Sequence, residues 1–172
     1  MEFCSIQSAD NDTIAALMRV YPESMEVLYQ KNFEGRYSTE ADARTAQTND
    51  YTESIAAFLA QEDRYIFAFR DGDTIAAALR VIHMGEDNWY LEALGTAPEY
   101  RGQGIAKRLL KQTLRLMRTL PAHSIVSLVR RDNEASRAVH EACGFTDTGM
   151  TAKDDEGTTV EECMVYRYIY PN

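Results

Sequence analysis

The first third of the chain carries hydrophobic residues at helical spacing, separated by polar stretches. Such residues recur over 14–21, where Asp10 or Asp12 could cap the amino terminus of a helix. Pro22 interrupts this pattern and suits the first turn of a second helix. Residues 1–7 alternate only weakly, so they predict at most a short first strand.

A polar stretch and a helix start follow. Residues 31–49 are polar and show no period, which predicts a loop. Asp50 and Glu53 precede the apolar Ile55 and Phe58, an arrangement typical of a capping box. We therefore expect a third helix to begin near Asp50.

From Tyr65 onward the pattern becomes that of strands. Residues 65–70 are rich in aromatic and β-branched side chains. The Asp-Gly-Asp turn at 71–73 predicts a hairpin, so residues 74–84 should return antiparallel to the first strand. Residues 89–96 predict the next strand, and the three together predict an antiparallel meander.

The last part of the chain mixes helices and strands. A glycine-bearing loop at 98–104 opens an amphipathic helix, which Pro121 should end. The remaining elements are a strand at 124–129, a helix at 133–143 closed by Gly144, and two final strands at 145–153 and 159–170. The whole pattern predicts an α+β (mixed α/β) domain, with helices packed on one sheet.

Composition narrows the functional classes. The 172 residues are 45% hydrophobic and 26% charged, which fits one globular domain over 1–172. No apolar run could span a bilayer, and residues 1–12 do not resemble a secretory signal, so no membrane partner is expected. The net charge of −9 disfavours nucleic acid as a partner. It is mildly compatible with a cationic acceptor, but solubility alone explains it better.

The cysteines indicate the compartment and the absence of a metal. Cys4, Cys143 and Cys163 are scattered and lack C-x-x-C spacing, which predicts neither a disulfide framework nor a zinc site. We therefore expect no metal, and a reduced, cytoplasmic setting.

The segment Arg101-Gly-Gln-Gly-Ile-Ala106 carries the most chemical information. It follows a strand and opens a helix, where glycines let backbone N–H groups approach an anion. The helix dipole favours phosphate at the same place. The segment lacks the Lys-Ser/Thr ending of a mononucleotide P-loop and the third glycine of a dinucleotide fingerprint. A pyrophosphate of another kind suits it, and a simple surface turn is the alternative.

A second motif establishes a family resemblance. Pro98-Glu-Tyr-Arg-Gly-Gln-Gly-Ile-Ala106 matches the Arg/Gln-x-x-Gly-x-Gly/Ala loop of the GNAT superfamily of N-acetyltransferases. Residues 133–145 resemble that family's Asn-x-x-Ala/Ser-x-x-aliphatic-Tyr-x-x-x-Gly-Phe stretch, and only His140, at the Tyr position, departs from it. The resemblance covers 1–170 and implies a GNAT-like, mostly antiparallel sheet of about seven strands flanked by about four helices.

The resemblance also implies acetyl-CoA as the co-substrate of an N-acetyltransferase that acts by direct attack of a primary amine. The backbone groups expected at the pyrophosphate are those of Arg101, Gly102, Gln103, Gly104, Ile105 and Ala106. Those near Leu94 and Thr96 would pair with the pantetheine arm as an added strand does. Asn133 would reach the same ligand, cap its own helix, or do both.

Two side chains are candidates for proton transfer. Glu92 lies two residues before Leu94, so the two side chains should share one face of the sheet. A carboxylate among apolar neighbours could serve as the general base, although a solvated glutamate fits the sequence equally well. His140 would act as the general acid for the leaving thiolate in place of Tyr, or would merely pack beside the coenzyme.

The acceptor and the assembly stay open at this point. The amine could belong to a small molecule, such as a polyamine, amino acid or aminoglycoside, or to a protein N-terminus or lysine. A homodimer is compatible with the family by analogy. The alternative to an enzyme is a non-catalytic module that binds coenzyme A as a sensor, which the substitution at His140 keeps in play.

Overall fold

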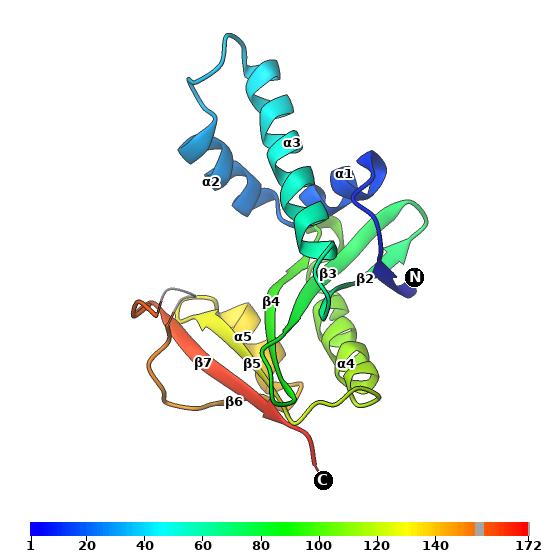
Figure 1. The fold of residues 1–172 in the computed structure, drawn as a ribbon, viewed down its shortest axis with the longest axis vertical. Helices are drawn as coiled ribbons and strands as arrows, with labels where there is room; N and C mark the ends of the chain where they lie inside the picture. The colour runs from blue at the N-terminus through cyan, green and yellow to red at the C-terminus, as the bar shows by residue number, and fades with distance from the viewer. Residues whose placement is uncertain (154–156, 172) are drawn as a thin grey trace.

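A twisted sheet of seven strands forms the centre of the computed structural model, which describes residues 1–153 and 157–171 (Figure 1). The strands are β1 Glu2–Ile6, β2 Arg64–Asp71, β3 Thr74–His83, β4 Asn88–Thr96, β5 Ser124–Arg130, β6 Thr146–Asp147 and β7 Cys163–Ile169. The helices are α1 Asn11–Val20, α2 Pro22–Asn32, α3 Glu40–Leu59, α4 Ile105–Met117 and α5 Glu134–Glu141, with a 3-10 turn at Pro98–Tyr100. The expected α+β class is confirmed, with five α-helices among the described residues rather than about four.

The first half of the sheet is the antiparallel meander that the strand pattern predicts. β1, β2, β3 and β4 follow one another in space. β4 then pairs in parallel with β5, from Asn88↔Ser124 to Leu91↔Ser127. Beyond Leu91 this pairing stops and the two strands part, which creates the space for the site described below.

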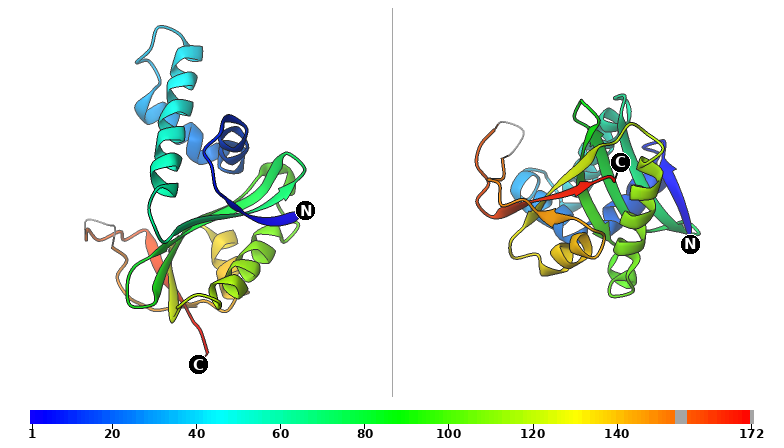
Figure 2. Two further views of the ribbon diagram at one scale, coloured as in Figure 1. Left: turned by 45° about the vertical axis from the view of Figure 1, so that its right-hand side comes forward. Right: turned by 90° about the horizontal axis from the view of Figure 1, so that it is seen from below.

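Helices cover both faces of the sheet, because successive strand residues point to opposite sides. On β2, Ile66 belongs to the core shared with α1 and α3, whereas the next residue, Phe67, belongs to the core under α4. Figure 2 shows α1 and α3 on one side of the sheet and α4 and α5 on the other. β4 therefore lies between the two helical layers.

The expected loop at 31–49 is confined to residues 33–39, and the helix start at Asp50 is wrong, because α3 already begins at Glu40. Thr39 caps it: its hydroxyl oxygen accepts from the backbone N–H of Asp42 at 3.1 Å, and its O–H donates to the Asp42 carboxylate at 2.8 Å. The first turns of α3 look like a loop in sequence because α2 and α3 project from the body as a helical hairpin (Figure 1). Most of the surface of such a projecting helix faces solvent, so its sequence shows only a weak hydrophobic periodicity.

The two final strands are shorter than expected. Only Thr146–Asp147 of the predicted strand at 145–153 forms β6, and β7 begins at Cys163. Pairing ends after Thr148, because the next two N–H groups donate to side chains instead: Gly149 to the Asp147 carboxylate at 2.9 Å and Met150 to the Thr148 hydroxyl oxygen at 3.2 Å. Most of the expected turn at 154–157 lies outside the described residues.

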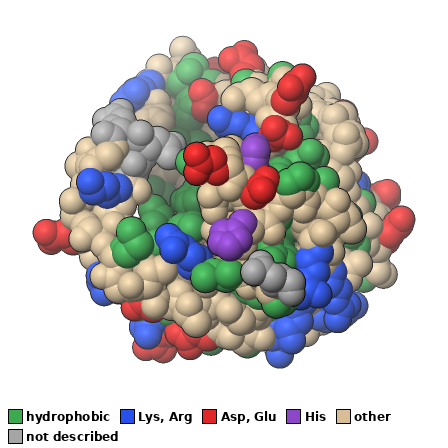
Figure 3. Space-filling view, turned by 60° about the horizontal axis from the view of Figure 1, so that its bottom comes forward, with side chains coloured by type: hydrophobic (Ala, Val, Ile, Leu, Met, Phe, Trp, Pro, Cys, Tyr) green, Lys and Arg blue, Asp and Glu red, His purple; other side chains and the backbone are tan. Residues whose placement is uncertain are grey.

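The outward side of α4 is basic although the chain as a whole is acidic. Lys107, Arg108, Lys111 and Arg115 are exposed on this helix, and its first turn contains no acidic residue. In Figure 3, basic side chains gather at the lower right of the face shown, where α4 lies. This local positive charge favours the approach of an anion to the end of the helix.

Among the described residues, none of the helices is long and apolar enough to cross a membrane. Cys4, Cys143 and Cys163 are free thiols.

Candidate active site

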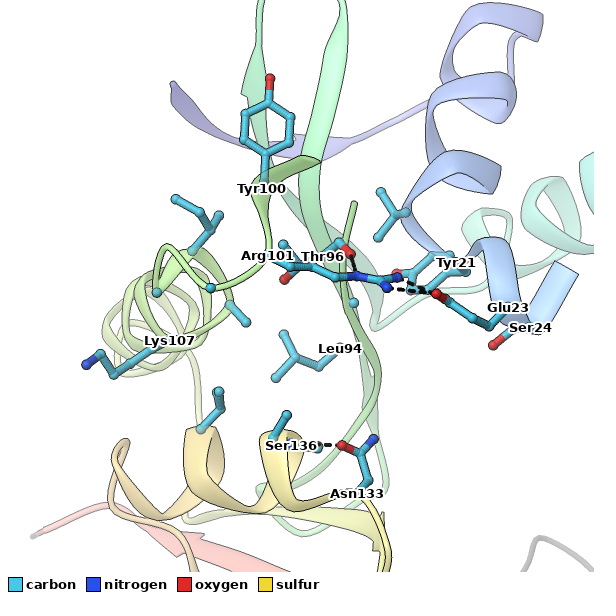
Figure 4. A pocket seen from close by; sticks show the side chains of 18 residues that line it. Tyr21, Glu23, Ser24, Leu94, Thr96, Tyr100, Arg101, Lys107, Asn133 and Ser136 are labelled. Carbon is cyan, nitrogen blue, oxygen red and sulfur yellow. Dashed lines mark hydrogen bonds and ion pairs between the residues drawn. The ribbon is translucent and has the colours of Figure 1, made fainter. Parts of the chain in front are cut away.

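A groove of about 690 Å³ opens where β4 and β5 part (Figure 4). One wall is the end of β4, the other is the start of α5, and the glycine loop before α4 lies between them. Eight of the predicted coenzyme-binding residues line it: Leu94, Thr96, Arg101, Gly102, Gly104, Ile105, Ala106 and Asn133. Gln103 is not among the lining residues; its side-chain amide donates to the Glu99 carbonyl at 3.0 Å. The structure thus brings two distant motifs to one cavity.

The glycine loop exposes backbone donors at this groove. Gly102 and Gly104 have φ values of 74° and 72°, the left-handed region that a residue with a side chain rarely adopts. Gly104 is the N-cap of α4, and no described side chain caps this helix end by a hydrogen bond. The first N–H groups of an α-helix lack partners within the helix, so those of α4 remain available to an anionic ligand.

A β-bulge shapes the wall formed by β4. Arg80 of β3 faces Glu92, but the next recorded pair is Ala78 with Gly95, so β4 holds one residue more than β3 here. Ala93 has a φ of 51°, and its carbonyl accepts a hydrogen bond from the Tyr21 hydroxyl at 2.8 Å. Tyr21 therefore holds the bulge from the corner between α1 and α2.

Glu92 and Leu94 do not share one face, contrary to the prediction, because the bulge lies between them. The Glu92 carboxylate is 2.9 Å from Nε of Arg80, whose guanidinium lies 5.3 Å from the ring centroid of Phe58 on α3. Leu94 instead packs against the core beneath α4 and lines the groove. Glu92 does not line the groove, so any base role must be exercised from the α3 side of β4.

His140 is buried beneath the groove wall rather than presented to it. Its side chain is 1% exposed, and it is not among the lining residues, although its neighbours Ser136 and Val139 are. Nδ1 lies 2.8 Å from the Ser136 carbonyl oxygen, so Nδ1 carries the proton. Nε2 has no hydrogen-bond partner among the described residues. This geometry favours the packing role over that of a general acid, since the neutral ring has no free N–H.

Burial lowers the pKa of His140, and a bond to the Ser136 carbonyl only partly opposes this effect. The unfolded chain binds a proton here below pH about 6.5, whereas the folded chain does so only at lower pH. Stability should therefore fall as pH drops below about 6.5, by at most about 1.4 kcal/mol per pH unit from this group. We expect His140→Phe to remove this part of the slope in urea unfolding at pH 7.5 and 5.5. His123→Gln, an exposed control, should keep it, and equal slopes in all three proteins would contradict the prediction.

Asn133 is the N-cap of α5. Its side-chain oxygen accepts from the Ser136 N–H at 2.9 Å, and the residue also lines the groove. The capping role that the sequence suggests is therefore confirmed, and the position is compatible with a second role toward a ligand.

Arg101 crosses the groove toward α2 (Figure 4). Its two terminal nitrogens bind the Glu23 carboxylate at 2.7 and 2.9 Å, and its Nε donates to the Thr96 carbonyl at 3.1 Å. The hydrogen bonds from Arg101 lower the pKa of Glu23, so this carboxylate stays ionised. Both side chains are substantially exposed, and such a pair contributes little to stability.

Glu23→Gln should tighten the binding of an anionic ligand by about two- to fivefold. The substitution removes a negative charge from the groove and releases Arg101, and both changes favour an anion. Titration with coenzyme A at low and high salt measures the effect, which salt should reduce. Glu26→Gln, on the same helix but not lining the groove, is the matched control. Weaker binding by the Glu23 variant would show that the pair instead holds the groove in shape.

Tyr21, Glu23 and Ser24 are site residues that the sequence did not reveal. Tyr21-Pro22 marks a break between two helices. This local signal does not predict that the break lies beside β4, more than 70 residues later in the chain. The described residues contain no group of three His, Cys, Asp or Glu side chains placed to hold a metal ion.

Comparisons with known proteins agree with this geometry. The model described as "Acetyltransferase (GNAT) family" matches residues 22–145. N-alpha-acetyltransferase 30 of Schizosaccharomyces pombe is 34% identical over 92 residues, which cover 51% of this chain and 61% of that protein. N-alpha-acetyltransferase RimI of Mycobacterium tuberculosis is 29% identical over 96 residues, which cover 54% and 58%. The matched part thus spans less than two thirds of either relative.

A solved structure shows the same fold over the whole chain. The PaiA N-acetyltransferase of Thermoplasma acidophilum, determined in complex with coenzyme A, superposes with a TM-score of 0.69. The alignment covers 99% of this chain and 100% of that one, at 18% identity. A likeness at this identity establishes the arrangement of strands and helices.

Proposed function

The chain belongs to the GNAT acetyltransferase family, and from that premise we propose that it transfers the acetyl group of acetyl-CoA to a primary amine. The observation that carries this proposal is the groove, in which an open strand edge meets an uncapped helix end. Acetyl-CoA supplies the acetyl group as a thioester; transfer forms an amide and releases the coenzyme as a thiol.

The groove suits the chemical parts of this co-substrate. The N–H groups of the glycine loop and the first turn of α4 would hold the pyrophosphate, with Lys107 nearby as a further cation. The edge of β4 from Leu94 to Thr96 faces the groove where pairing with β5 has ended. Its backbone groups would pair with the amides of the pantetheine arm, as a strand pairs with an added strand.

The two relatives' names favour a peptide α-amine as the acceptor, because both are N-alpha-acetyltransferases. Such an amine is mostly protonated near neutral pH and must lose a proton before it can attack a carbonyl carbon. An acceptor α-amine therefore needs a base that takes its proton. An amine with a lower pKa would depend less on such a base.

Glu92 is the proposed base. Its carboxylate lies 2.9 Å from Nε of Arg80, and Arg80 lines a smaller cavity beside the bulge. Glu92 does not line that cavity itself, so it would accept the proton of the amine through one water or after a small movement of its side chain. His140 has no part in this proposal, because its N–H is directed at the Ser136 carbonyl.

Calorimetric titration with acetyl-CoA, followed by thiol release against a panel of peptides and small amines, tests the proposal. Glu92→Gln should lower kcat by about 10²-fold or more and leave the Kd for acetyl-CoA unchanged. Glu53→Gln, on the exposed side of α3, should change neither quantity. Binding without thiol release on any amine would favour the sensor alternative, and absence of binding would refute the coenzyme assignment.

A further inference from the structure

A second cavity adjoins the groove at the bulge of β4. It has a volume of about 260 Å³ and lies among α1, α2, α3 and the strands β2, β3 and β4. Tyr21, Ser24 and Leu94 line both spaces, so the cavity and the groove lie side by side at these residues. If the acetyl group lies beside the bulge, this cavity is where the group attached to the attacking amine would be placed.

The walls of this cavity are mainly apolar. Its apolar and aromatic lining includes Leu17, Met25, Tyr51, Ile55 and Ile66. The Tyr21 hydroxyl faces away from solvent and already donates to the Ala93 carbonyl. An apolar surface of this kind binds an apolar group by removing both surfaces from water.

The lining offers no free carboxylate to a cation. None of the described residues that line the cavity is acidic, and its one charged member, Arg80, is already paired with Glu92 at 2.9 Å. A polyamine or an aminoglycoside would bring further ammonium groups into this apolar space with no lining carboxylate to pair with them.

The size of the cavity points the same way. Pockets for drug-sized ligands usually measure about 300–1,000 Å³, so a cavity of 260 Å³ suits one side chain better than a multi-ring sugar. Met25 lies on α2, in the helical hairpin that projects from the body. Helix α2 therefore separates this edge of the cavity from solvent. The remainder of a longer acceptor could leave past this helix.

We infer that the acceptor is an α-amine whose own residue carries a large apolar side chain, as in a peptide that begins with Leu, Met or Phe. The side chain fills the cavity between β4 and the three amino-terminal helices, and the apolar lining disfavours a basic side chain. This inference rests on the proposed acetyltransferase function and adds the chemical class of its substrate.

A peptide series that differs only in the first residue tests the inference. With Leu, Met, Phe, Ser, Asp or Lys at that position, kcat/KM should be at least about tenfold higher for the three apolar peptides. Spermidine should be a poorer acceptor than any of these three. Equal or faster turnover of the Lys peptide or of spermidine would overturn the inference and leave the acetyltransferase function standing. Failure of every amine to release thiol would refute the function itself, and the inference with it.

Two substitutions on one helix locate the preference. Met25 lines the cavity and is half-buried, whereas Val27 is 64% exposed and lies outside it. Met25→Glu should lower kcat/KM for the Leu peptide by about tenfold or more and reduce the ratio of Leu to Lys turnover. Val27→Glu adds the same charge and should leave both values unchanged. The Kd for acetyl-CoA should stay the same in both variants. Equal effects of the two substitutions, or no effect of Met25→Glu, would overturn the placement of the side chain.

Discussion

Gly104→Val should weaken acetyl-CoA binding by at least about tenfold, because the residue occupies the left-handed region at the N-cap of α4. A β-branched residue there costs about 1–3 kcal/mol, and each 1.4 kcal/mol corresponds to a tenfold change in affinity. No heavy atom lies within 4 Å of the position that a Cβ would take, so backbone strain and not collision is the cause. Rotation of the loop would relieve that strain and would turn its N–H groups away from the groove. Calorimetric titration measures the loss.

Gly72→Val is the matched control for this prediction. Gly72 has a φ of 60°, equally open surroundings, and a place in the β2–β3 turn away from the groove. Both variants should lose a similar free energy of unfolding, since both force a β-branched residue into the same region. Only Gly104→Val should lose affinity for the coenzyme. A similar loss of affinity in both would mean that general destabilisation, and not the loop, controls binding.

Gly95→Ala should lower the free energy of unfolding by about 1–3 kcal/mol and reduce turnover. A Cβ at this position would overlap Cε1 of Tyr21 and would lie 2.7 Å from its Cδ1 and 3.0 Å from Cγ1 of Val20. The Tyr21 ring must then move, which breaks its hydrogen bond to the Ala93 carbonyl and releases the bulge. Urea unfolding and thiol release measure the two effects.

A double-mutant cycle shows whether the collision is the cause. Tyr21→Ala removes the ring that the new methyl group would meet, so Gly95→Ala should cost clearly less in that background. Tyr21→Phe keeps the ring and removes only the hydroxyl, so the full cost of Gly95→Ala should remain. Simple additivity in the Tyr21→Ala background would contradict this account of Gly95.

Features that depend on a few neighbouring residues are predictable here. The cap of α1 at Asp10, Pro22 in the first turn of α2, and the tight β2–β3 turn all occur as the sequence indicates. The loop at 101–106 also stands before a helix, with two glycines in the left-handed region. Each of these depends on side-chain-to-backbone bonds or φ preferences that act within one turn.

The start of α3 shows where local patterns fail. Thr39 is a good cap, but polar residues follow it, and polarity without a period is typical of a loop. The segment is helical because Ala43 packs against Tyr29 and Phe33 in a small cluster that the two projecting helices share. A contact between two helices decides this element, and neither helix displays it alone.

Local patterns predict the order of elements and the two motifs, and the family resemblance adds the class of co-substrate. Contacts between distant segments give Ala93 its positive φ, separate the side chains of Glu92 and Leu94, bury His140 and pair Arg101 with Glu23. Local preferences act over a few residues, whereas each of these outcomes results from packing or pairing between segments that meet only in the folded chain. The Tyr21 bond to Ala93 joins residues 72 positions apart, and it is such long-range contacts that shape the proposed acceptor side of the site.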